Sequence, residues 1–207
     1  MKAAIVFLTL VSLGLAAPQL RKPFHDHFSD FMNIIREETG HDLNDLMEHY
    51  AEFDEFKATL EYITEKNFNA IVHEMEDLPE FKAIVDFLEG HEIDITYFIE
   101  MINEFIDFIG SGERLRQEIS GKDLSAYTKD SIDILPKEKL AALYDSKVES
   151  DEEFKRAMES LKSDEWKELW NALWENETFK AEVDELAENG IELASLLDEI
   201  VAIFGQN

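Results

Sequence analysis

The chain has 207 residues, with 47 Asp and Glu against 19 Lys and Arg, and its formal net charge at pH 7 is −28. Such a charge repels nucleic-acid phosphates and anionic lipid headgroups and keeps copies of the chain apart, so we expect no nucleic-acid partner and a monomer. Because 45% of the residues are hydrophobic, the chain also differs from acidic disordered proteins and can form an apolar core.

Residues 1–16 have the organisation of a secretory signal peptide. Lys2 precedes an apolar run from Ala3 to Leu15, which ends among small residues. This run is shorter than the roughly 20 residues that a membrane-spanning helix needs. We therefore expect cleavage after Ala16 and a secreted, extracellular protein. The chain has no cysteine, so its stability must come from burial and not from disulfides.

Apolar residues at helical spacing predict short helices at the start of the mature chain. We expect the first over residues 24–38, with Thr39 and Gly40 as its stop, and a second over 42–50 with Asp42 as its cap. Three more helices follow, at 54–63, 66–75 and 79–90, the last opened by Pro79 and capped by Gly90.

Residues 94–109 are apolar over most of a helix circumference. Their polar residues Thr96, Glu100, Asn103 and Asp107 fall on one narrow line. A surface helix needs an apolar stripe only about 100° wide. We therefore expect a central helix that is buried on at least two sides.

Residues 110–112 contain two glycines and form the flexible joint at which we place the boundary between the two halves. A charged connecting helix is expected over 113–120. Apolar stripes then continue to a closing segment at 193–204. The local signals in this half are Pro136 as a helix start, Asp151 and Ser163 as caps, and Asn189-Gly190 as a stop.

The two halves match at a single shift of 98 positions, without gaps. Phe56-Lys57 falls on Phe154-Lys155, and the segment 81–83 falls on 179–181, which has the same sequence, Phe-Lys-Ala. Apolar residues continue to meet apolar residues as far as 106 and 204, which indicates two copies of one structural unit. The sequence predicts an all-α protein with two homologous repeats of about six short helices, in 24–110 and 111–207.

Signals for catalysis or metal binding are weak. His73, with Glu74 and Asp77, only approaches a zinc-protease motif, and His25 and His27 lack an evident third ligand. The sequence contains no Gly-x-Ser-x-Gly motif, no glycine-rich phosphate loop and no cysteine nucleophile. We expect no enzyme activity, no metal and no cofactor. Asn176 begins an Asn-Glu-Thr sequon and is a candidate for glycosylation.

Trp166, Trp170 and Trp174 are spaced at i, i+4 and i+8 of one predicted helix. They form either ordinary core or a stripe that stacks on a ligand or contacts a membrane, and core is our first interpretation. Their counterparts in the first half run from aromatic to charged: Phe68, Val72 and Glu76. Trp174 is therefore the strongest candidate of the three for a local role.

Five segments of the second half together resemble the insect allergen repeat family, which includes microvillar midgut allergens of cockroaches and two-repeat midgut proteins that a blood meal induces in mosquitoes. They are 130–136 (DSIDILP), 151–154 (DEEF), 163–166 (SDEW), 177–179 (ETF) and 190–193 (GIEL). The first half has the same frame, except that residues 38–41 replace the Leu-Pro that opens a short helix.

This resemblance implies that the two repeats close into one hollow capsule around a large apolar cavity, which holds fatty-acid or phospholipid acyl chains. The candidate lining residues are Ile34, Leu46, Leu60, Ile63, Phe68, Val72, Phe81, Val85, Phe98, Ile102, Phe105, Leu143, Met158, Leu161, Trp166, Trp170, Phe179, Val183, Leu196, Ile200 and Ile203.

Three classes of function follow from the resemblance. The first is a secreted gut-lumen lipid carrier, with lipids as its partners. The second is a membrane-active effector, which exchanges lipids with cell or viral membranes and disrupts them. The third is a midgut enzyme or detoxifying factor. Because the chain is so acidic, lipid exchange would have to rely on hydrophobic contact and not on electrostatic docking.

Overall fold

The computed structural model describes residues 23–63, 66–94, 119–193, 195–196 and 202–204. In these ranges every regular element is an α-helix, which confirms the all-α prediction. The helices are α1 (Pro23–Tyr50), α2 (Asp54–Ile63), α3 (Lys66–Asp77), α4 (Pro79–Gly90), α6 (Leu124–Ile134), α7 (Lys137–Ser150), α8 (Glu152–Ser160), α9 (Asp164–Glu175) and α10 (Glu177–Glu188). The expected helix at 94–109, apart from Asp94, and the joint at 110–112 lie outside the described residues, as does most of the expected helix at 113–120.

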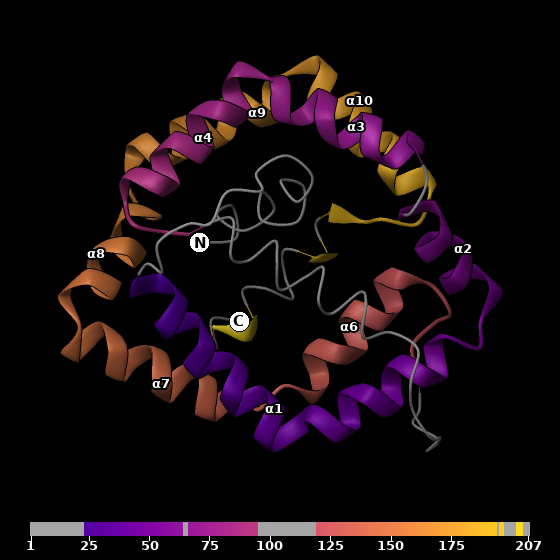
Figure 1. Ribbon diagram of the computed structural model, residues 1–207, viewed down its shortest axis with the longest axis horizontal. Coiled ribbons are helices and arrows are strands. Elements are labelled where there is room, and N and C mark those ends of the chain that lie inside the picture. The colour runs from indigo at the N-terminus through magenta and orange to yellow at the C-terminus, as the bar shows by residue number, and fades with distance from the viewer. Residues whose placement is uncertain (1–22, 64–65, 95–118, 194, 197–201, 205–207) are drawn as a thin grey trace.

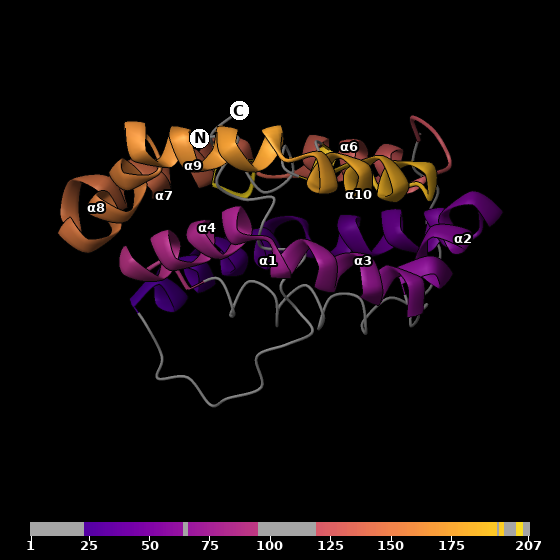
Figure 2. The same cartoon turned by 90° about the horizontal axis from the view of Figure 1, so that it is seen from above.

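The described helices are arranged as a ring when the molecule is viewed down its shortest axis (Figure 1). Seen from above, the ring has two tiers (Figure 2). One tier contains α1 to α4 and the other contains α6 to α10, so the two halves of the sequence form different tiers.

The two tiers pack on each other around the ring. Helix α1 contacts α6, α7 and α8, while α2 contacts α6. On the opposite side, α3 contacts α10 and α4 contacts α9. The molecule is therefore held together by contacts between its halves, in addition to the neighbouring pairs α3–α4, α7–α8 and α9–α10.

Helix boundaries follow the shift of 98 positions. Adding 98 to the bounds of α3 gives those of α9, and adding 98 to the bounds of α4 gives those of α10. Helix α2 corresponds to α8 in the same way, to within one residue. Helix α1 covers the counterparts of both α6 and α7.

The predicted break at Thr39-Gly40 is wrong, because α1 runs without interruption through 28 residues. Asp42 is therefore inside a helix and is not a cap. Glycine in a helix interior costs only about 1 kcal/mol relative to alanine, which burial of neighbouring side chains can offset. The Thr39 hydroxyl donates a hydrogen bond to the carbonyl of Ile35, at 3.0 Å, so it is accommodated within the helix.

A proline explains why the second half differs. Pro136 forces Leu135 into an extended conformation, with φ −56° and ψ 143°, and α6 ends at Ile134. The position that corresponds to Pro136 in the first half is Glu38, which has a backbone N–H and fits a helix. The proline therefore accounts for the break between α6 and α7, whereas no proline interrupts α1.

The expected caps in the second half are confirmed. Asp151 accepts hydrogen bonds from the backbone N–H groups of Glu153 and Phe154 at the start of α8, both at 2.9 Å. Ser163 accepts one from Trp166 N at the start of α9, at 3.1 Å. These bonds satisfy donors that have no partner within the helix and fix where each helix begins.

The predicted cap at Gly90 is wrong, because Gly90 is the last residue of α4 itself. The left-handed residue that follows this helix is Glu92, with φ 62°. Its counterpart is Gly190, with φ 83°, where the predicted stop is correct. In both turns a backbone N–H two or three residues past the helix donates back to it: Ile93 N to Leu88 O at 3.0 Å, and Ile191 N to Leu186 O at 2.9 Å.

Candidate functional site

One apolar cluster extends through the helices of both tiers. Its fully buried side chains include Phe28 and Phe31 of α1, Phe81 of α4, Phe154 of α8 and Phe179 of α10. Burial of apolar surface contributes about 25 cal/mol per Å². Because both tiers supply these side chains, separating the tiers would expose much of the core.

Most of the predicted lining residues belong to this cluster. Its buried members are Val72, Phe81, Met158, Leu161, Trp166 and Phe179, and its partly buried members are Ile34, Ile63, Phe68, Val85, Leu143, Trp170, Val183, Leu196 and Ile203. Four others, Phe98, Ile102, Phe105 and Ile200, lie outside the described residues. That these residues line a cavity stays a prediction.

Leu46 and Leu60 lie elsewhere, in a second and smaller cluster. Leu46 is packed there with Tyr50 of α1, Phe56 of α2 and Tyr127 of α6, and Leu60 is partly buried against them. The Tyr50 hydroxyl donates to Asp130 Oδ2 at 2.7 Å. Burial and this bond raise the pKa of Tyr50 to about 12. The side chains of this second cluster pack α1 and α2 against α6.

Several large apolar side chains are packed against the main cluster yet remain partly exposed. They include Phe68 of α3 and Leu169, Trp170 and Trp174 of α9. Leu169 and Trp174 are absent from the predicted lining set. The signal that identifies them is their spacing from Trp166, which places them on or beside the same stripe of α9.

The three tryptophans form a line of neighbouring rings along α9. The ring centroids of Trp166 and Trp170 are 6.1 Å apart, and those of Trp170 and Trp174 are 5.6 Å apart. The line ends against Phe87 of α4, 5.3 Å from Trp166, and against Phe179 of α10, 5.2 Å from Trp174. The stripe is therefore part of the core at Trp166 and is partly exposed at Trp170 and Trp174.

Two indole nitrogens in this line are buried and make no hydrogen bond within the described ranges of the chain. They are Nε1 of Trp166 and Nε1 of Trp174. Trp166 is only 1% exposed, whereas Trp174 is partly buried. Nε1 of Trp170, between them, is not among the buried atoms without a partner.

The counterpart of Trp174 on α3 is an acidic residue, Glu76. Its side chain is partly buried, and one carboxyl oxygen, Oε1, is buried without a hydrogen-bond partner. The other oxygen lies 3.2 Å from His73 Nδ1. Burial raises the pKa of Glu76 because the charged form is poorly solvated there. The two halves therefore present different polar groups at this position.

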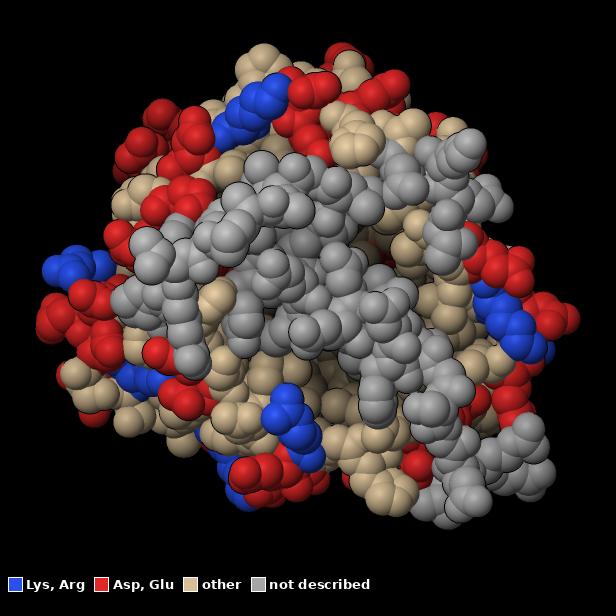
Figure 3. Space-filling view, viewed as in Figure 1, with Lys and Arg blue, Asp and Glu red and all other residues tan. Residues whose placement is uncertain are grey.

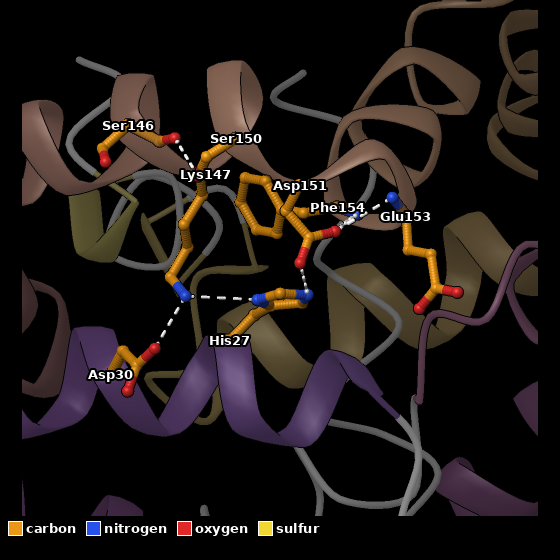
Figure 4. A network of polar contacts seen from close by, with 8 residues as sticks. All are labelled: His27, Asp30, Ser146, Lys147, Ser150, Asp151, Glu153 and Phe154. Atoms are coloured by element: carbon orange, nitrogen blue, oxygen red, sulfur yellow. Dashed lines mark hydrogen bonds and ion pairs between the residues drawn. The ribbon is translucent and has the colours of Figure 1, made fainter.

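A polar network joins α1 to the second tier near α7 and α8 (Figure 4). Lys147 Nζ donates to Asp30 Oδ2 at 2.7 Å and to His27 Nδ1 at 3.1 Å. His27 Nε2 faces Asp151 Oδ2 at 3.4 Å. Because Nδ1 accepts from the lysine, His27 is neutral with its proton on Nε2. His27 lies inside α1, as the helix predicted over 24–38 implies.

The environment of His27 disfavours its protonation. Burial lowers the pKa of His27, and the nearby Lys147 ammonium lowers it further, although Asp151 and Asp30 oppose this. The neighbouring His25 contacts Asp94 Oδ2 at 3.0 Å, and Asp94 is buried. Both histidines thus serve contacts between chain segments. Among the described residues, no three His, Asp or Glu side chains gather closely enough to hold a metal ion.

Carboxyl groups meet where α3 packs on α10. Burial and a hydrogen bond with Glu74 raise the pKa of Glu182 to about 7, with a further contribution from the charge of Glu185. Glu185 in turn accepts a hydrogen bond from Asn67 Nδ2 at 2.8 Å. The α3–α10 contact is therefore favoured when Glu182 holds a proton.

The exposed surface is strongly acidic. On the face seen in Figure 3, Asp and Glu side chains lie along the outer edge of the ring, with Lys and Arg scattered between them. None of the described helices combines the length and the apolar character that crossing a bilayer requires. Access to a membrane by electrostatic attraction to anionic lipids is thus disfavoured.

Asn176, the predicted glycosylation site, is the N-cap of α10. Its side-chain oxygen accepts a hydrogen bond from Phe179 N at 3.1 Å, and its Nδ2 donates to Glu80 Oε2 of α4 at 3.2 Å. A glycan would replace one of the two hydrogens on Nδ2, so the bond to Glu80 would have to use the other. Its occupancy stays a prediction.

Comparison with known proteins identifies the fold. A family profile described as insect allergen related repeat, nitrile-specifier detoxification, matches residues 23–197. The chain belongs to the insect allergen related repeat family. It is also similar to Protein G12 of Anopheles gambiae, with 26% identity over 216 residues that cover 99% of each chain.

Membership in the insect allergen related repeat family confirms the resemblance that the sequence segments indicated. The matched range contains α1 to α4 and α6 to α10. The similarity to the mosquito protein extends over both tiers, so it concerns the whole arrangement of helices and not a single segment.

Proposed function

We propose that this protein is a secreted, midgut-associated lipid carrier, in which the two repeats close into one capsule and an apolar interior holds lipid acyl chains. The observation that carries this proposal is the larger apolar cluster, to which helices of both tiers contribute and against which large apolar side chains stay partly exposed. Such side chains are suited to contact an apolar ligand. The carrier needs no catalytic residue, metal or cofactor.

Two regularities support a capsule of two repeats related by an approximate two-fold axis. The bounds of α3 and α4 recur in α9 and α10 at the shift of 98 positions. The contacts between tiers also occur in matching pairs. Helix α3 packs on α10, and their counterparts, α9 and α4, pack on each other. Likewise α2 contacts α6, and α8 contacts α1. A two-fold arrangement makes each contact occur twice in this way.

The energetics favour an acyl chain over an empty apolar space. Burial of each methylene contributes about 0.8 kcal/mol, so a long chain supplies on the order of 10 kcal/mol of gross driving force. Part of this is offset by the cost of ordering the ligand and the protein. The remainder appears as affinity and as stability of the folded state.

Family membership supports the proposed midgut association. Membership in the insect allergen related repeat family suggests a midgut-associated protein, and the apolar start of the sequence supports secretion. The high negative charge supports a monomer that remains dispersed.

Extraction and thermal unfolding test the proposal together. Solvent extraction of the denatured protein, followed by mass spectrometry, should release lipid in a fixed ratio to the chain. Because a ligand that binds only the folded state raises its stability, removal of lipid should lower the melting temperature and added long-chain fatty acid should restore it. Shorter chains should restore less, since each methylene lost forfeits roughly 0.8 kcal/mol.

A solid helical core predicts the opposite result. Extraction would then yield no stoichiometric lipid, and the melting temperature would not depend on chain length. That outcome would exclude the carrier. If the loaded protein binds lipid but also makes liposomes or red cells leak, the function is that of a membrane-active effector, and leakage should depend on which lipid is loaded.

A further inference from the structure

The indole of Trp166 is a buried hydrogen-bond donor that has no partner within the described part of the chain. The residue is 1% exposed, and its Nε1 makes no hydrogen bond to any described residue. Its neighbours are aromatic: Phe87 lies 5.3 Å and Trp170 6.1 Å away between ring centroids. Aromatic packing explains why the ring is buried, but it leaves the N–H group unexplained.

Such a donor is unusual in a folded protein. A buried Tyr or Trp normally finds a partner for its polar atom, because burial without one forfeits the bond to water. A buried donor that the protein does not satisfy therefore calls for another acceptor. In a cluster proposed to hold lipid, the available acceptors are an ordered water and an oxygen atom of the ligand.

The other half of the molecule lacks this donor. The counterpart of Trp166 is Phe68, which has an aromatic ring but no N–H group. The counterpart of Trp174 is Glu76, whose buried Oε1 is an acceptor without a partner and whose charge would repel an anion. Indole N–H donors therefore lie along α9, whereas a carboxyl group lies on α3. The polar end of an amphiphile would find a hydrogen-bond donor at α9 and an acidic group at α3.

We propose that the N–H group of Trp166 binds a carboxyl or ester oxygen of the bound lipid, and so holds the polar end of that lipid at α9. This inference rests on the proposed lipid-carrier function. Fatty acids and acylglycerol lipids share the required chemistry, an sp² oxygen at the end of an apolar chain. The two halves are then unequal in ligand binding, and the lipid has one preferred orientation.

The fold tolerates the substitution that tests this assignment. Trp166→Phe keeps an aromatic ring and removes only the N–H group and part of the ring, and Phe68 shows that the same position in the first half accepts phenylalanine. Trp170→Phe is the matched control. It removes an indole from the same line of rings, but one whose Nε1 is not left buried without a partner.

The experiment compares three ligands of equal chain length, titrated calorimetrically into the full chain after lipid extraction. Myristic acid presents a carboxyl group, methyl myristate presents only an ester, and tetradecane presents no acceptor. With Trp166→Phe, affinity should fall roughly 10-fold or more for the acid and about 2- to 10-fold for the ester, as expected for a bond to a charged and to a neutral acceptor. Affinity for tetradecane should stay within about twofold, because no hydrogen bond is lost.

Trp170→Phe should change the affinity for all three ligands by one common factor. If Trp166→Phe also weakens all three equally, the ring only packs against the chain and the assignment is wrong. If it weakens none of them, the N–H group is satisfied by water and the assignment is again wrong. A selective loss with Trp174→Phe in place of Trp166→Phe would place the oxygen elsewhere on α9 and overturn it.

A spectroscopic readout does not depend on how the variants fold. The chain has three tryptophans, so the wild-type protein gives three indole N–H signals in a proton–nitrogen correlation spectrum. Myristic acid should move one signal downfield, and tetradecane should not. Identical spectra with both ligands would contradict the proposal. If the wild type binds none of the three ligands, the lipid-carrier function itself fails, and the flat wild-type titration distinguishes that result from a wrong assignment of Trp166.

Discussion

The turns after α4 and α10 place different residues in the same left-handed conformation, and this gives two opposite predictions. Gly190 has φ 83° and its counterpart Glu92 has φ 62°. The left-handed region costs a non-glycine residue roughly 1–2 kcal/mol. Gly190→Ala should therefore destabilise the protein, whereas Glu92→Gly should stabilise it.

The magnitude at Gly190 includes a contact with the other tier. A methyl group there would collide with the hydroxyl of Thr59 of α2, which is buried and donates a hydrogen bond to the carbonyl of Asn189 at 3.1 Å. Loss of that bond adds about 1 kcal/mol. Restriction of the unfolded chain returns about 0.4–1 kcal/mol. The net destabilisation should be roughly 1–2.5 kcal/mol.

At Glu92 the terms have the opposite sign. Glycine removes a strain of roughly 1–2 kcal/mol, but it makes the unfolded chain more flexible at a cost of about 0.5–1 kcal/mol. Glu92→Gly should therefore stabilise the protein by about 0.5–1 kcal/mol. Gly90→Ala is the control, because Gly90 is helical and an added methyl group meets nothing within 4 Å. That change should stabilise the protein by up to about 1 kcal/mol.

Urea unfolding followed by circular dichroism measures all three variants, with thermal unfolding as a second readout. For a chain of this length, 1–2.5 kcal/mol corresponds to a fall in melting temperature of roughly 2–10 °C. If Gly190→Ala unfolds at the same urea concentration as Gly90→Ala, neither the left-handed strain nor the contact with Thr59 contributes as argued. A destabilising Glu92→Gly would show that the Glu92 side chain makes a compensating interaction.

Three further predictions concern the contacts between tiers. Glu182→Gln should stabilise the protein by about 1 kcal/mol near pH 8. In the wild type, stability should fall as the pH rises from 4.5 to about 7, because the unfolded chain loses a proton that folded Glu182 keeps. The variant should reduce this fall, and an unchanged pH profile of urea unfolding would contradict the prediction. The wild type should lose stability as the pH falls below 6.5, because unfolded His27 binds a proton that folded His27, with its lowered pKa, does not. His27→Gln should abolish this loss. If the same pH series shows that the loss persists in the variant, another group causes it. Glu38→Pro should cost roughly 3 kcal/mol by interrupting α1; a cost below about 1 kcal/mol would mean that the helix gains little from being continuous.

Local signals explain which parts of the fold could be predicted. Pro79 starts α4, and Asp151 and Ser163 cap α8 and α9, as expected, because each acts on the backbone within three residues of itself. The fixed shift between the halves then transfers these boundaries from one half to the other.

The errors arose where tertiary packing or backbone geometry decides. Thr39-Gly40 looks like a stop, but contacts of α1 with α6, α7 and α8 hold it as one helix. Gly90 looks like a cap, but the left-handed residue is Glu92. Periodicity identifies the apolar face of a helix, but it does not separate the fully buried Trp166 from the partly exposed Trp170. The unpaired N–H group of Trp166 could not be predicted either, since it depends on every atom around it.

The unequal first helices give the two tiers different mechanical properties. At 1.5 Å per residue, the 28 residues of α1 form a continuous rod of about 42 Å, braced by hydrogen bonds along its length. The opposite tier has a joint at Leu135-Pro136, where no helical hydrogen bonds link α6 to α7. A force that separates the tiers should therefore bend the chain at this joint and leave α1 straight. If the proposed capsule takes up and releases lipid, we expect α6 to move against α7 while α1 stays in place.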